Sequence, residues 1–142
     1  MVGITNTVGG SGELDTTDMP IAFWYGTTAN TTSSWQGGTT QAQSYNSEYV
    51  WYSDGVFTFK KACTCNVYGR GLGTNNSSGN SVTLQWRIGK NGSSTVLANG
   101  SGSGSTSDSA SVTFNVGDRV AIYGKASLGS RCSMTLAIKL PT

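Results

Sequence analysis

The residue types that carry out chemistry in proteins are sparse in this sequence. It contains no histidine, the commonest general base and the commonest metal ligand. Cys63 and Cys65 are two residues apart, so both thiols would lie on one face of a β-strand. Zinc needs about four ligands, and the sequence adds only one further thiol, Cys132, and no histidine to this pair. We therefore predict no metal site and three reduced, buried thiols, which an odd cysteine count also favours.

The carboxylates and glycines also lack a catalytic arrangement. A glycosidase needs two carboxyl groups that face each other across a cleft, whereas Asp54 and Asp118 each adjoin a glycine in the pattern of a turn. Residues 69–73 read Gly-Arg-Gly-Leu-Gly, which lacks the Lys-Ser/Thr pair and the following helix of a phosphate-binding loop. We interpret that segment as an ordinary loop. The sequence thus predicts a protein that binds and assembles, with no catalytic residues and no cofactor.

Charge is scarce and unevenly distributed along the chain. Charged residues make up 11% of the 142 residues, against roughly 25% in an average soluble protein. Residues 1–54 carry five acids and no base, and the remainder carries nine bases and two acids. Either the N-terminal part lies against a basic surface, or the asymmetry is an accident of loop composition. The bases are scattered, which argues against nucleic-acid binding, and no apolar run is long enough to cross a membrane.

Hydrophobic residues recur with a period of two, which predicts strands along most of the chain. Residues 81–89 alternate cleanly and lead into Asn91-Gly92, the strongest short signal for a hairpin. Residues 132–140 form the clearest strand, and residues 55–68 form another after an Asp54-Gly55 turn. Seven or eight such strands, joined by loops of uneven length, predict an all-β fold, a β-sandwich.

Two segments are expected to lie outside these strands. Residues 99–111 are almost entirely glycine and serine, whose side chains offset little of the entropy lost on ordering, so we expect a mobile loop. Residues 1–47 are acidic and irregular in pattern. We expect them to form an extended N-terminal arm and attachment segment ahead of a sandwich at residues 48–142.

Ten of the fourteen aromatic residues fall within residues 23–59. Trp and Tyr offer a flat face and a polar tip, so they serve in cores, in interfaces and on glycan-binding surfaces. We predict core positions for Trp51, Phe57, Phe59 and Trp86. In the uncharged stretch 19–47 all three roles stay open, and the candidate attachment or interface residues there are Phe23, Trp24, Tyr25, Trp35 and Tyr45. The candidate glycan contacts are Tyr49, Tyr52 and Tyr68.

Three short motifs carry a family resemblance. They are Asp-Gly-Val-Phe-Thr-Phe at 54–59, a hairpin with Lys-Asn-Gly within 88–93, and Val-Thr-Phe-Asn-Val-Gly-Asp-Arg-Val at 112–120. Together they resemble the trimeric jelly-roll head shared by tumour necrosis factor-like and complement-collagen-like domains and by many short phage virion proteins. The resemblance spans about two-thirds of the chain and implies a jelly-roll fold and a homotrimer. The sequence shows no collagen stalk, coiled coil or signal peptide, so the resemblance favours a bacterial virus over an animal secreted ligand.

On this basis we expect a non-enzymatic structural protein of a tailed phage, assembled in the cytoplasm of the bacterial host. Its jelly-roll trimer would decorate the capsid or attach as a head fibre. The alternative is a receptor-binding module at the tail tip that recognises a glycan on the host surface. The expected partners are further copies of the chain and other virion proteins, with a host glycan in the alternative, and neither nucleic acid nor a membrane.

Overall fold

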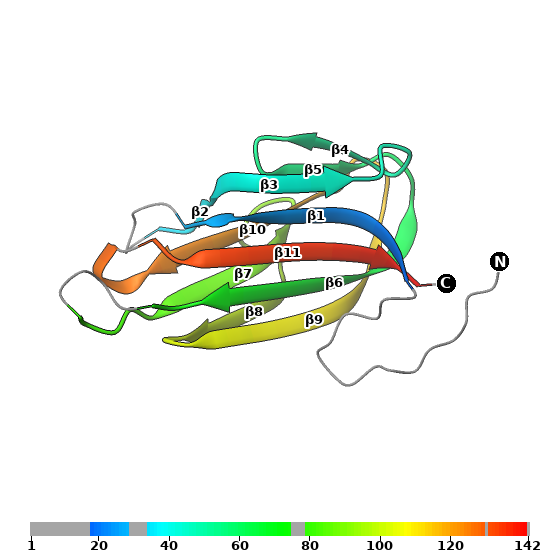
Figure 1. Ribbon diagram of the computed structural model, residues 1–142. Coiled ribbons are helices and arrows are strands. Elements are labelled where there is room, and N and C mark those ends of the chain that lie inside the picture. Colours follow the sequence, from blue (N-terminus) through cyan, green and yellow to red (C-terminus); the bar gives the residue numbers. More distant parts are fainter. Residues whose placement is uncertain (1–17, 29–33, 75–78, 130, 142) are drawn as a thin grey trace.

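Two antiparallel β-sheets lie face to face in the computed structural model, which describes residues 18–28, 34–74, 79–129 and 131–141 (Figure 1). Across the A sheet the strands follow the order β3 (Thr39–Tyr45), β1 (Met19–Thr27), β11 (Ser133–Leu140), β6 (Cys63–Leu72) and β9 (Ser105–Phe114). Across the B sheet they follow the order β4 (Val50–Ser53), β5 (Val56–Phe59), β10 (Arg119–Ala126), β7 (Leu84–Lys90) and β8 (Val96–Gly102). A two-residue strand, β2 (Gln36–Gly37), pairs with β10.

The chain alternates between the two sheets from β8 to β11, as it does in a jelly roll. The prediction of an all-β jelly-roll sandwich is confirmed. The described ranges contain one helical segment, the 3₁₀ turn Ser127–Gly129. No helix in that part of the chain is long and apolar enough to cross a membrane.

Alternating burial along the strands builds the core between the sheets. Phe59 of β5 and Phe114 of β9 stack across the two sheets with ring centroids 4.1 Å apart. Each fully buried side chain of this size contributes about 1.5–3 kcal/mol relative to its exposed state. The period-two pattern predicted the inward positions of β7 and β11, which are Leu84, Trp86, Ile88, Met134, Leu136 and Ile138.

Two turns predicted from short sequence signals are confirmed. Asp54 and Gly55 join β4 to β5 with φ of 49° and 83°, and Asn91 and Gly92 lie between β7 and β8 with φ of 60° and 122°. Asn, Asp and Gly are the residues that adopt positive φ at least cost. The Asp54-Gly55 pair fits the two-residue hairpin connection that matches the twist of the flanking strands.

Trp51 is not a core residue, contrary to the expectation from the sequence. It lies on the edge strand β4 opposite Thr58, and the inward neighbour Val50 takes the core position. Its side chain is 62% exposed, and the Lys60 ammonium lies 4.5 Å from its ring centroid. Phe57, Phe59 and Trp86 are buried as predicted.

The sandwich does not begin at residue 48. β1 lies inside the A sheet between β3 and β11, and Ile21 and Trp24 are both buried in the core. β3 completes that edge of the sheet by pairing with β1 along most of its length. Residues 19–27 and 39–45 therefore belong to the jelly roll, and the part of the expected arm at residues 1–17 lies outside the described residues.

The two glycine-rich segments expected to be loops are mostly strand. β6 runs on through residues 69–72, and most of residues 99–111 belongs to β8 and β9, which are joined through residues 103–104. Two polar contacts order this hairpin, one from β7 to β9 and one from β8 to β9. Trp86 Nε1 donates a hydrogen bond of 2.8 Å to Thr106 Oγ1, and the Asn99 amide donates one of 3.0 Å to Asp108 Oδ2.

Because this hairpin is structure, we predict that changing it lowers stability. Removal of six residues from 101 to 106 should lower the melting temperature by more than about 10 °C, because it takes away Thr106 and leaves the buried Trp86 indole N–H without a partner. The single change Thr106→Val should lower the free energy of unfolding by about 1–3 kcal/mol for the same reason.

The matched control is Thr113→Val on the same strand, because Thr113 is exposed and its hydroxyl lies 2.8 Å from that of the exposed Thr64. Chemical denaturation of the three variants measures the difference. Equal stabilities for the Thr106 and Thr113 variants would show that the hairpin does not depend on the Trp86 contact.

Candidate functional site

The outer face of the A sheet carries a row of aromatic and small side chains. The strand registers place Phe23 of β1 opposite Ala137 of β11, Ala137 opposite Tyr68 of β6, and Tyr68 opposite Ser109 of β9. These positions alternate with buried residues, so their side chains point away from the core. Phe23 remains 38% exposed, while Ala137 between the two aromatic residues is buried. The row crosses four strands of the sheet.

A second, more polar row lies beside the first. Tyr25 is opposite Thr135, Thr135 is opposite Arg70, and Arg70 is opposite Ser107. The Tyr25 hydroxyl lies 3.5 Å from the Ser133 hydroxyl, and Arg70 Nε donates a hydrogen bond of 3.1 Å to Ser105 Oγ. The guanidinium is thus held against the sheet.

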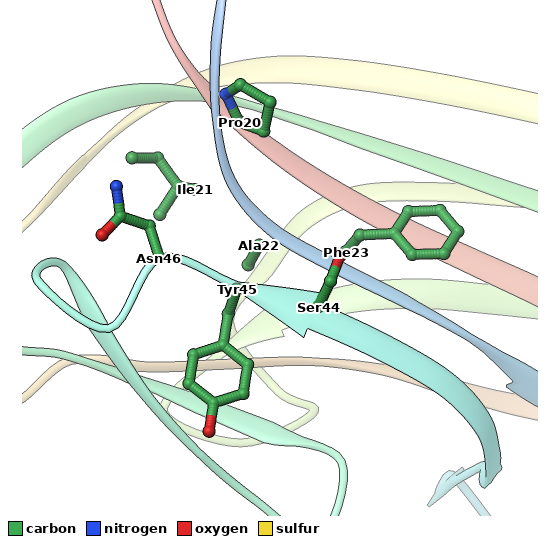
Figure 2. A pocket seen from close by; sticks show the side chains of 7 residues that line it. All are labelled: Pro20, Ile21, Ala22, Phe23, Ser44, Tyr45 and Asn46. Carbon is green, nitrogen blue, oxygen red and sulfur yellow. The ribbon is translucent and has the colours of Figure 1, made fainter.

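Three shallow hollows mark this face and its β1–β3 margin. One, of about 250 Å³, lies over β1 and β3, where Figure 2 shows Phe23 and Tyr45 pointing to opposite sides of the strand pair. A second, of about 210 Å³, lies beside Tyr25 and Arg70. A third, of about 320 Å³, lies beside Tyr68 and Ser109. The surface is therefore uneven, with aromatic projections between depressions.

The outward positions of the five A-sheet strands hold two cations and no carboxylate. The cations are Arg70 and Lys139, and the outward positions of β9 carry serine and threonine. The Asp108 carboxylate of β9 points to the other side, where it accepts the Asn99 amide. Exposed aromatic side chains and a scarcity of charge are two features that this face shares with the core of a protein interface.

The expected attachment residues do not all lie on this face. Phe23 and Tyr25 do, but Trp24 is 1% exposed, and its indole N–H donates a hydrogen bond of 2.9 Å to Thr40 Oγ1. Trp24 is therefore a core residue and offers no surface to a partner. Tyr45 is 44% exposed at the sheet edge, and Trp35 lies against the B sheet, over Arg87 and Lys125.

The three tyrosines expected to contact a glycan do not form one site. The Tyr52 hydroxyl lies 2.8 Å from Thr40 Oγ1 and accepts a hydrogen bond of 3.0 Å from the Gly55 amide, so it joins the two sheets at their edge. Tyr49 packs against the core below the Lys61 ammonium. Tyr68 lies on the outer face of the A sheet, away from both.

The thiols are poor candidates for chemistry. Cys65 and Cys132 are buried as predicted, Cys63 is half-buried, and none of the three is in a disulfide. Burial, with the Cys63 thiol 3.4 Å away as a lesser cause, raises the pKa of Cys65 to about 12. Burial also raises the pKa of Cys132. A thiol must lose its proton to act as a nucleophile or a metal ligand, so both are held in the inert form.

Asp118 stabilises the turn between β9 and β10. Asp118 Oδ2 accepts a hydrogen bond of 2.8 Å from the Asn115 amide, and Oδ1 accepts one of 3.1 Å from Asn91 Nδ2. The Asn115 contact is the largest cause of a lowered Asp118 pKa, with Asn91 next and Lys90 adding a smaller effect. Within the described ranges no three His, Cys, Asp or Glu side chains are grouped closely enough to hold a metal ion.

Sequence reasoning missed the aromatic row as a unit. Phe23, Tyr68 and Ala137 are far apart in the chain, and only the register through β11 brings them together. The alternation in residues 132–140 did place Ala137 on the face opposite Leu136 and Ile138. No comparable signal identified β1 as its partner.

We predict that the folded protein hides its thiols from a chromogenic thiol reagent. At pH 8, Cys65 and Cys132 should react far more slowly than Cys63, because both are buried and their raised pKa values leave little thiolate. Denaturation without reductant should then release three reactive thiols, and fewer than three would reveal a disulfide.

The variant Cys65→Ser should lower the free energy of unfolding by about 1–3 kcal/mol, because it leaves a poorly paired buried hydroxyl. Cys63→Ser is the matched control and should cost less.

Comparison with known proteins identifies the fold. The globular domain of zebrafish complement 1qA protein is similar with a TM-score of 0.55 at 16% identity, covering 83% of this chain and 95% of that chain. Murine APRIL is similar with a TM-score of 0.50 at 13% identity, covering 85% of this chain and 98% of that chain. No protein-family model matches the sequence, and no curated protein matches it significantly. Neither structure is a phage protein, so the similarity shows the jelly-roll fold and leaves a phage origin unsupported.

Proposed function

We propose that the protein is a non-enzymatic module that assembles with copies of itself through the outer face of the A sheet, as a homotrimer on a phage particle. The observation that carries self-assembly is the row from Phe23 through Ala137 to Tyr68 on a face with no carboxylate. An apolar face of this kind, rimmed by polar side chains, is typical of an interaction surface.

The chemistry of this face suits a second copy of the same chain. Its uneven surface offers aromatic projections and hollows of about 210 and 320 Å³, so one copy can place a ring into a depression of the next. In a rotational trimer, different patches of the same face meet, which needs projections and hollows on one surface. The sequence resemblance to trimeric jelly-roll heads supports three copies over two.

The phage particle is the proposed setting because of the resemblance to short virion proteins. Within that setting, the proposed role is decoration of the capsid or attachment as a head fibre. The acidic N-terminal residues before β1 are the proposed attachment segment. A tail-tip module that recognises host glycan is the rival, and it differs in needing a defined sugar ligand.

We predict a trimer in solution that one charge disrupts. Light scattering after gel filtration at micromolar concentration should give about three times the 14.8 kDa chain mass. Phe23→Glu should give monomers, because it places a carboxylate in the apolar row. Trp51→Glu makes the same kind of change at a 62% exposed aromatic residue of the B sheet and should remain trimeric. A wild-type monomer, or dissociation of the Trp51 variant alone, would contradict the assignment.

We predict that attachment to particles depends on residues 1–17. A variant without them should keep a folded sandwich by circular dichroism, since β1 begins at Met19. It should co-sediment several-fold less than the full chain with phage particles prepared without the protein. Deletion of residues 1–47 should instead prevent folding, because it removes β1, β3 and the buried Trp24. Full occupancy by the shorter deletion would place the attachment surface on the jelly roll, and absence of the protein from purified parent particles would refute the virion role.

A further inference from the structure

Trp35 holds two cations together on the outer face of the B sheet. The Arg87 guanidinium carbon lies 3.8 Å from the Trp35 ring centroid, and the Lys125 ammonium lies 4.7 Å from it. Arg87 is on β7 and Lys125 is on the neighbouring β10, where they are diagonal neighbours because Lys125 is opposite Gln85. The indole thus orders two flexible basic side chains beside each other.

Neither cation forms a salt bridge with a carboxylate of the described residues. The ion pairs in that part of the chain are Lys61 with Glu48 and Lys90 with Asp118. Arg87 Nη1 donates a hydrogen bond of 3.0 Å to the Ser93 carbonyl, which fixes the guanidinium and leaves its other N–H groups available. The charge at this place is therefore positioned but not neutralised.

A hollow of about 250 Å³ lies beside Arg87 and Trp35, and the Lys125 ammonium lies over the same indole that forms part of the hollow's wall. Trp35, Arg87 and Val96 form part of its wall, and the rest includes three polar side chains that make no hydrogen bond to any other described side chain or backbone group. Those three are Gln85, Asn99 and Ser101. They project from adjacent strands, since Asn99 is opposite Arg87 and Ser101 is opposite Gln85. The hollow thus combines an aromatic wall, positive charge and uncommitted hydrogen-bonding groups.

We propose that this hollow binds an anionic sugar, a pyranose that carries a carboxylate or a phosphate group. Arg87 and Lys125 would pair with the anionic group, because a fixed guanidinium makes strong charge-assisted hydrogen bonds to such oxygens. The side chains of Gln85, Asn99 and Ser101 would exchange hydrogen bonds with the ring hydroxyls. The apolar wall, Trp35 with Val96, would contact the C–H groups of the ring.

A nucleic acid fits this place less well. Phosphate-backbone binding relies on basic residues spread along a stripe, whereas this hollow holds two cations beside one another. A sugar also uses the three free polar side chains, which a backbone contact would leave unpaired. The hollow lies on the B sheet, whereas the proposed assembly face lies on the A sheet. A test of sugar binding is therefore independent of whether the protein forms a trimer.

The test is an NMR titration of the ¹⁵N-labelled full-length protein, with the indole N–H signals of the four tryptophans as local reporters. The probes are trigalacturonate, mannose 6-phosphate, neutral galactotriose and a short oligothymidylate. The Trp35 signal should shift and saturate with at least one of the two anionic sugars, and the Trp51 signal should not. Which sugar binds more tightly identifies the anionic group that the site prefers.

The variant Arg87→Gln should weaken that binding by roughly tenfold or more, as expected for loss of a charged hydrogen bond. Arg119→Gln is the matched control, since Arg119 is an exposed cation about 20 Å along β10 from Lys125. The Arg119→Gln variant should bind the anionic sugar with unchanged affinity, and circular dichroism should show that both variants are folded. Equal binding of galactotriose, tighter binding of the oligothymidylate, equal affinity of the two variants, or no shift of the Trp35 signal would each overturn the proposal.

Discussion

The packing of Trp86 between the two sheets is the constraint on which the rest of the structure depends. A Cβ atom at Gly69 would lie 2.3 Å from this indole, one at Gly71 would lie 2.3 Å away, and one at Gly100 would lie 2.4 Å away. No side chain fits at those three positions while Trp86 keeps its place. The indole N–H completes the arrangement by bonding Thr106 on the facing strand. These three glycines lie in segments whose composition suggests loops, but they are there because the Trp86 indole occupies the space that a side chain would need.

The sandwich fixed in this way has two outer faces of different character. Strand register decides which side chains share a face, because a shift of one residue would turn every outward side chain inward. The A sheet presents Phe23 and Tyr68 among small and hydroxyl side chains, and the B sheet presents Trp35 with two unneutralised cations. One face has the composition for contact with another copy, and the other has the composition for an anionic ligand.

Much of the fold could be predicted from local signals, and the errors have a common physical cause. Alternation predicted the strands at 81–89 and 132–140, and Asn91-Gly92 predicted the hairpin, because these signals lie within a few residues. Residues 99–111 were wrongly expected to be a loop, because glycine and serine carry no periodic pattern and their order comes from the distant Trp86. The position of β1 in the sheet could not be read either, since its partner β11 lies more than 100 residues further along the chain.

The candidate site was less predictable than the fold for the same reason. Phe23 and Tyr25 were named from composition, but Trp24 between them is buried, and Tyr68 joins Phe23 only through Ala137. The central claim is that this row contacts another copy of the chain. A photo-crosslinking amino acid at position 68 tests it most directly in the purified protein. The account predicts covalent dimers and trimers joined through A-sheet residues, with none from the same reagent at position 51. Crosslinks from position 51 and none from position 68 would contradict it.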